Sequence, residues 1–250
     1  RLTRIATTLG VRKLRITGGE PLLRPNLSDL IGDLGTLPGI DDIALTTNGV
    51  LLAKYATELK AAGLTRITVS LDSLDPQVFA AMSGGYGGVE QVLEGIDAAR
   101  TAGLAPIKVN VVVQRGLNDH TVPELLQRFR HTGVIVRFIE YMDVGASNGW
   151  NMDEVIPSSE VVRRISAEMP LEPIGANYAG ETAARWRYVD GGGVGMILRE
   201  PVDVVIQGIQ AAGGAQSRLA HRPAQALLPP PCSVDEVGAT AQHSAKPGAQ

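Results

Sequence analysis

The first 143 positions alternate between two hydrophobic patterns. A short run rich in β-branched residues is followed by a polar or glycine-containing turn, and then by a stretch in which apolar residues recur with helical spacing. The runs that predict strands are 13–17, 42–48, 66–72, 107–114 and 134–142. Strands separated by helices need crossover connections, so the pattern predicts a parallel sheet.

Four stretches between these runs predict helices. They span 26–37, 50–63, 87–103 and 121–133. Asn26 can cap the first of them, and a glycine ends each of the other three. Five such strand–helix units exceed a small open sheet, so the chain is expected to form an α/β fold, a complete or partial (βα) barrel.

The pattern weakens after residue 143. The stretch 157–169 predicts one capped helix, and 184–197 predicts a strand, a glycine turn and a second strand. Residues 200–250 contain no aromatic residue and are rich in Ala, Gln, Gly and Pro, which is typical of disorder. The sequence therefore predicts a barrel region over 1–143, the start of a C-terminal region over 144–197 and a low-complexity tail over 198–250.

Composition narrows the classes of function. The net charge of −3 gives no global basic field for nucleic acid or an anionic membrane, and no apolar run approaches the roughly 18 residues of a membrane span. The single cysteine, Cys232, excludes an intrachain disulfide and favours a reducing cytoplasm. The chain starts at Arg1 inside a helical pattern, so we expect an upstream segment to be missing.

The predicted carboxyl ends of the strands are far more polar than their starts, and in βα barrels chemistry gathers at these ends. At the first of them, Gly18 and Gly19 would let a ligand approach the backbone closely, and the Glu20 carboxylate beside them could accept hydrogen bonds from an ammonium group. The alternative is a tight turn with a solvated glutamate. Further donors and acceptors at the same rim are Thr46, Thr47, Asn48, Ser70 and Asn110.

Three basic residues, Arg15, Lys108 and Arg137, lie within apolar strand patterns. Because an unpaired buried charge is costly, they indicate an anionic ligand such as a phosphate, or else internal pairing with the carboxylates of Asp42, Asp72 or Glu140. Met142, at the end of the fifth strand pattern, is either core filler or a contact for an adenine or thioether group.

These pieces resemble, in order and approximate spacing, the radical S-adenosylmethionine (SAM) enzymes, and among them the GTP 3′,8-cyclases of molybdenum cofactor biosynthesis. The matching segments are VRKLRITGGEPLLRPNL, IALTTNGVLL, AGLTRITVSLDSLDPQVF, IKVNVVVQRGLND, VRFIEYMDVGASNGW and RWRYVDGGGVGMI. The resemblance covers residues 1 to about 197. It implies an incomplete (βα) barrel of the radical SAM type, truncated at the N-terminus and followed by an aberrant, disordered tail.

The resemblance also implies ligands and a reaction. The residues that would contact SAM are Gly18, Gly19, Glu20, Ser70 and Met142, and those that would contact GTP are Arg15, Thr46 and Lys108. A 5′-deoxyadenosyl radical from SAM would convert GTP to (8S)-3′,8-cyclo-7,8-dihydroguanosine 5′-triphosphate. A cyclic pyranopterin monophosphate synthase would act on this product, and the family suggests a homodimer.

The sequence departs from the family in its cysteines. The family holds two 4Fe–4S clusters, each on three cysteines, and one cysteine cannot hold such a cluster. We therefore expect this chain to be inactive in the radical reaction. The abrupt change of composition near Ile197 suggests a reading-frame shift, a hypothesis that fails if no frame beyond codon 197 encodes cluster cysteines.

Three alternatives stay open from the sequence. The chain is a non-catalytic nucleotide-binding remnant, or it belongs to another branch of the radical SAM enzymes. The third alternative is a metal-independent barrel lyase, which needs a general acid–base pair. Its candidates are Glu20, Asp72 and Glu140, since no histidine falls at a strand end.

Overall fold

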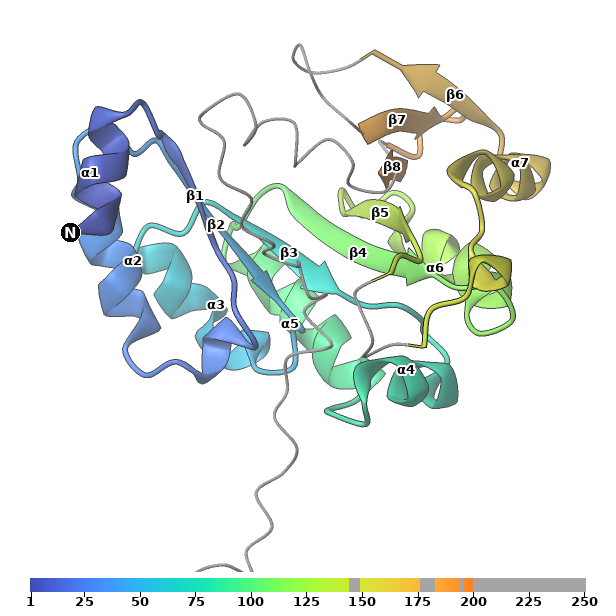
Figure 1. Cartoon of the computed structure of the whole chain (residues 1–250), viewed down its shortest axis with the longest axis horizontal. Helices are drawn as coiled ribbons and strands as arrows, with labels where there is room; N and C mark the ends of the chain where they lie inside the picture. Colours follow the sequence, from blue (N-terminus) through green and yellow to red (C-terminus); the bar gives the residue numbers. More distant parts are fainter. Residues whose placement is uncertain (144–148, 176–182, 194–195, 200–250) are drawn as a thin grey trace, which may run out of the picture.

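The computed structural model describes residues 1–143, 149–175 and 183–193, together with the backbone of 196–199. Within these ranges the strands form one sheet in the order β1-β2-β3-β4-β5-β8-β7-β6 (Figure 1). The first five strands are β1 (Lys13–Ile16), β2 (Asp42–Thr47), β3 (Arg66–Ser70), β4 (Ile107–Val113) and β5 (Ile135–Glu140). They pair in parallel, which confirms the predicted α/β sheet with crossover connections.

Helix α1 (Leu2–Thr8) precedes β1, and the other helices lie between successive strands of the chain. They are α2 (Leu27–Gly35), α3 (Leu52–Ala61), α4 (Pro76–Ser83), α5 (Val89–Thr101), α6 (Val122–Phe129) and α7 (Ser158–Glu168), with short 3₁₀ turns η1 (Pro21–Leu23), η2 (Asp119–Thr121) and η3 (Met152–Glu154). No helix among the described residues is long and apolar enough to cross a membrane.

The sheet continues past β5 with three more strands. Strand β8 (Met196–Arg199) pairs in parallel with β5, and β7 (Ala183–Tyr188) and β6 (Leu171–Ile174) follow it in antiparallel pairing. The two strands predicted within 184–197 are therefore present, and β8 ends two residues beyond that range. The tail predicted over 198–250 lies, from residue 200 on, outside the described residues.

Two local predictions need correction. Asn26 occupies the N-cap position of α2, but its backbone is left-handed (φ 56°) and its side chain makes no capping hydrogen bond. The helix α4 was not predicted, although Asp75 caps it by accepting hydrogen bonds from the N–H groups of Gln77 and Val78, and Pro76 occupies its first turn.

The alternation of burial along the strands explains how the sheet presents its two faces. In β4, Val109 and Val111 are fully buried on the helix-covered face, whereas Lys108 and Asn110 on the other face are half-buried. The apolar face packs with the helices into one continuous core. The opposite, inner face is left with the polar strand residues.

Helix α5 makes a close contact with the turn between β2 and α3. Helix α5 approaches the turn after β2 so nearly that a Cβ on Gly95 would lie 2.6 Å from the Gly49 carbonyl oxygen and 3.0 Å from the Leu52 Cβ. Gly49 itself has φ +84°, and a Cβ there would lie 2.7 Å from Val69 Cγ1. Glycine is therefore required at both positions for this approach.

We predict that Gly95→Ala destabilises the protein by about 1–3 kcal/mol, because the added methyl group overpacks the contact between α5 and the β2–α3 turn. Gly32→Ala in α2 is the matched control, since a Cβ there meets no atom within 4 Å. The control should leave stability unchanged or raise it by up to about 1 kcal/mol. Urea unfolding followed by circular dichroism measures both, and equal effects of the two substitutions would contradict the prediction.

Candidate functional site

The register of the parallel strands gathers the polar inner-face residues in two neighbouring rows. In the first row, Thr46 of β2 lies beside Thr68 of β3, which lies beside Lys108 of β4. In the second row, nearer the carboxyl ends, Ser70 of β3 lies beside Asn110 of β4, which lies beside Arg137 of β5. Residues from distant parts of the sequence thus share one surface.

A hydrogen bond extends the first row to β1. Arg15 Nη1 donates to Thr46 Oγ1 at 3.1 Å, although the two residues are 31 positions apart. Arg15 is exposed, whereas Thr46 and Lys108 are half-buried, so the guanidinium and the ammonium group both face an accessible surface. Such a pair of cationic groups beside hydroxyl groups suits a phosphorylated anion.

One of the three carboxylates that sequence reasoning offered as partners for these cations, Asp42, pairs with an arginine outside that set. Asp42 lies at the amino end of β2 and binds Arg66, whose Nε donates to Oδ1 at 3.0 Å. Burial acts to raise the pKa of Asp42, but the Arg66 guanidinium and the Thr65 hydroxyl outweigh it and hold that pKa below its usual value. Asp42 therefore has Arg66 as its partner at the end of the sheet away from the rim.

Glu20 joins the ends of β1 and β2. Its Oε1 accepts hydrogen bonds from Leu22 N (2.9 Å) and Thr47 Oγ1 (2.6 Å), and its Oε2 accepts one from Asn48 N (2.8 Å). This carboxylate links the ends of two strands through hydrogen bonds, a role that sequence reasoning missed. The expectation that it binds an ammonium group stays a prediction, with Oε2 retaining acceptor capacity.

The glycines before Glu20 leave the end of β1 accessible. Gly18 is exposed, Gly19 is half-buried, and a Cβ on Gly18 would meet no atom within 4 Å. Met142 is half-buried, two residues beyond the end of β5. The open space beside Gly18 gives a ligand room to approach the backbone.

Asp72 is buried where β3 and β4 end. Its Oδ1 accepts a hydrogen bond from Val112 N at 2.7 Å. Burial raises the pKa of Asp72 to about 7, and the hydrogen bond from Val112 opposes only part of that rise. A carboxyl group with this pKa is partly protonated at neutral pH.

Glu140, at the end of β5, holds the start of helix α7. Its Oε1 accepts a hydrogen bond from Ser158 N, at the first turn of α7, at 2.6 Å. The predicted cap of α7 thus comes from a strand residue 18 positions earlier rather than from the N-cap residue Pro157, which makes no side-chain capping bond. All three carboxylates proposed for acid–base chemistry therefore accept backbone N–H groups in the described structure.

Asn118 is a rim residue that sequence reasoning did not single out. It is fully buried, and its Nδ2 donates to the carbonyl oxygens of Asp72 and Val112, both at 2.8 Å. Its only sequence signal is an asparagine in the turn after β4, which is common in any turn. The sequence therefore does not predict that Asn118 bonds to Asp72, which lies 46 positions earlier.

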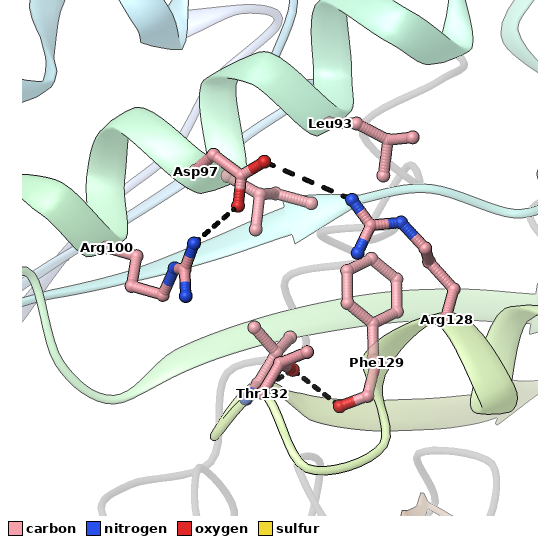
Figure 2. A pocket seen from close by; sticks show the side chains of 8 residues that line it. Leu93, Asp97, Arg100, Arg128, Phe129 and Thr132 are labelled. Carbon is pink, nitrogen blue, oxygen red and sulfur yellow. Dashed lines mark hydrogen bonds and ion pairs between the residues drawn. The ribbon is translucent and has the colours of Figure 1, made fainter.

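Two hollows lie away from these residues. Figure 2 shows one between α5 and α6, of about 310 Å³, where Asp97 contacts Arg100 at 3.2 Å and Arg128 at 4.0 Å. A second, of about 470 Å³, lies beside α6 and α7. Neither is lined by a residue of the inner face, and the described residues hold no group of three or more His, Cys, Asp or Glu side chains suited to a metal ion.

Comparison with known proteins matches residues 1–129 to the model of the radical SAM superfamily. The chain is 53% identical over 197 residues to a GTP 3′,8-cyclase of Xanthomonas campestris pv. campestris (strain 8004), covering 78% of this chain and 58% of that protein. It is 52% identical over 195 residues to the GTP 3′,8-cyclase of Acidothermus cellulolyticus, covering 77% of this chain and 54% of the relative. The chain thus spans little more than half the length of these relatives.

The fold is also similar to that of a solved structure. A radical SAM methyltransferase from Sphaerobacter thermophilus aligns with a TM-score of 0.54 at 17% identity, over 82% of this chain and 56% of that one. At this identity the likeness concerns the fold alone. It agrees with the sequence-based expectation of an incomplete barrel of the radical SAM type.

We predict that Asp72→Asn changes how stability depends on pH. The pKa of Asp72 rises from 3.8 to about 7 on folding, so its contribution is fully present below pH 4 and is lost as pH rises through 7. At about 1.4 kcal/mol per pKa unit, wild type should lose up to roughly 4 kcal/mol over this interval relative to Asp72→Asn.

Urea unfolding at several pH values measures this difference. The exposed Asp33 of α2 supplies the control, since Asp33→Asn makes the same chemical change at the surface and should keep the wild-type profile. Parallel pH profiles for wild type and Asp72→Asn would show that the carboxyl group titrates alike in the folded and unfolded chain, contrary to the prediction.

Proposed function

The chain belongs to the radical SAM superfamily, and on that premise we propose that its inner face is the ligand-binding face of a GTP 3′,8-cyclase. In this proposal Arg15, Thr46 and Lys108 bind GTP. Gly18, Gly19, Glu20, Ser70 and Met142 bind SAM. The observation that carries the proposal is the convergence of Arg15, Thr46 and Lys108 from three strands on one row.

The GTP part of the proposal rests on charge and register. Arg15 offers a planar fork of donors, and its hydrogen bond to Thr46 Oγ1 restricts where that fork points. Lys108 offers a point charge one strand beyond Thr68 in the same row. Two cations held at fixed positions on a rigid sheet can orient a triphosphate without moving when it binds.

The SAM part is supported by an acceptor that lacks a donor. Asn110 Oδ1 is buried and has no hydrogen-bond partner among the described residues, and Asn110 lies directly beside Ser70. A buried acceptor of this kind costs free energy unless a ligand supplies an N–H or O–H group. Together with the open space at Gly18, it fits a polar ligand lying along the second row.

When bound in such enzymes, SAM supplies a hydrogen-abstracting group for the GTP ribose. The contribution of this chain's residues is to hold the two ligands on adjacent rows, so that the ribose faces the cofactor. The family context adds to the proposal a downstream cyclic pyranopterin monophosphate synthase, a homodimeric assembly and a cytoplasmic location, which the single cysteine favours.

The residues present do not fit the iron–sulfur clusters that the family implies. A cluster needs three thiolates, the chain has only Cys232, and that residue lies outside the described ranges. We therefore derive no step through a cluster and propose that this polypeptide binds its ligands without converting them. The alternative of a metal-independent lyase is disfavoured, because Glu20, Asp72 and Glu140 are engaged with backbone N–H groups.

We predict that Lys108→Ala weakens GTP binding by about 10- to 100-fold, the loss expected when one charge-assisted contact of roughly 1.5–3 kcal/mol is removed. Isothermal titration calorimetry of the 250-residue chain measures it. Lys54→Ala is the control, because Lys54 is an exposed lysine of α3 whose Nζ lies 5.0 Å from the Tyr55 ring. Equal GTP affinity of Lys108→Ala and wild type would show that Lys108 does not contact GTP.

We also predict that this polypeptide yields no 5′-deoxyadenosine when supplied with SAM, GTP, iron, sulfide and a reductant, because it lacks the thiolates that hold a cluster. Liquid chromatography with mass spectrometry detects the product, and a radical SAM enzyme that keeps its three cysteines serves as the positive control. Turnover that depends on SAM would overturn the expectation of an inactive chain.

A further inference from the structure

The pairing of β3 with β4 stops abruptly at the inner-face site. The last ordinary rung runs from Leu71 N to the Asn110 carbonyl oxygen at 3.0 Å. In a regular parallel ladder the next rung would join Val112 N to the Leu71 carbonyl oxygen. Val112 N donates instead to Asp72 Oδ1 at 2.7 Å, so a side chain takes the place of a backbone acceptor.

A second side chain bridges the same opening from the other strand. Asn118 Nδ2 donates to the carbonyl oxygens of both Asp72 and Val112, and its Oδ1 accepts from Gln114 N at 2.8 Å. Thr121 Oγ1 donates to the Asn118 carbonyl oxygen at 2.9 Å and accepts from Ser73 Oγ at 3.1 Å. The four side chains of this network belong to buried residues, namely Asp72, Ser73, Asn118 and Thr121.

This bridge sets the distance between two strand ends that carry site residues. Ser70 is the last residue of β3, two positions before Asp72, and its neighbour across the sheet is Asn110, two positions before Val112. A continued ladder would draw the two strands together at the next rung, whereas a carboxylate spacer holds them further apart. The spacing at the SAM end of the site therefore depends on the length of the Asp72 side chain.

We propose that Asp72, held by Asn118, is a positioning residue for SAM binding: it ends the β3–β4 ladder and fixes Ser70 and Asn110 at the separation the ligand needs. The proposal rests on the assignment of this row to SAM. Asp72 contacts the ligand through no atom in this scheme and acts through Val112 and the strand ends. GTP binding on the row of Lys108, nearer the amino ends, depends less on it.

The test compares Asp72→Ala, Asp72→Asn and wild type in the full 250-residue chain. Asp72→Ala should speed amide hydrogen exchange at Val112 by at least about 10-fold and weaken SAM binding by about 10-fold, while GTP affinity changes by less than about threefold. Asp72→Asn keeps an Oδ1 acceptor and should restore both properties to within about threefold of wild type. Asp33→Ala is the matched surface control.

The outcomes separate this proposal from the function on which it rests. A wild-type chain that binds neither SAM nor GTP overturns the proposed function before any variant is made. Unchanged exchange at Val112, or faster exchange with unchanged SAM affinity, overturns the positioning role. If Asp72→Ala does not fold, Asn118→Ser, which shortens the bridging side chain, should produce the same preferential loss of SAM binding, and equal losses for SAM and GTP would overturn it.

Discussion

Backbone N–H groups at the carboxyl ends of parallel strands, and at the starts of the helical turns that follow them, need acceptors that the ladder no longer supplies, and this constraint shapes the rim of the barrel. The described structure meets it with carboxylates. Glu20 receives the N–H groups of Leu22 and Asn48, Asp72 receives that of Val112, and Glu140 receives that of Ser158. A buried N–H group without an acceptor would cost about 1–3 kcal/mol of stability. Each of these carboxylates removes that cost at an irregular strand end.

The same arrangement creates room for ligands. Because side chains rather than a continued ladder hold the strand ends, the ends can diverge while their polar groups stay satisfied. Inner-face residues such as Thr46, Lys108 and Asn110 then remain half-buried rather than closed into an apolar barrel core. A rigid, partly open face lined by cations and amides is suited to orienting charged small molecules, whatever reaction follows.

The sequence was sufficient for the five strands of the parallel sheet, and less so for the rim. The five parallel strands lie within two residues of their predicted limits, because short β-branched runs bounded by polar or glycine turns are a strong local signal. Strand ends and charge pointed to Thr46 and Lys108 one by one, and the register of the strands brings them into one row. What could not be predicted were the contacts of Glu20 with Asn48 and of Asn118 with Asp72, which span 28 and 46 positions. A glutamate or asparagine in a turn looks the same whether it is solvated or clasps another strand, and only the fold decides which occurs.

Holding a ligand and delivering an electron require different residues. The first requires polar and charged side chains fixed on the sheet, and the second requires cysteine thiolates. Orientation needs donors and charges fixed on a sheet, and Arg15, Thr46 and Lys108 sit on β1, β2 and β4, which are joined in parallel through β3. Electron delivery needs thiolates, of which this chain has one. The positions of the orienting side chains depend on the packing of the parallel sheet, for example on the contact of α5 with Gly49. The GTP-binding geometry that we propose thus depends on the packing of the sheet and on no cysteine side chain.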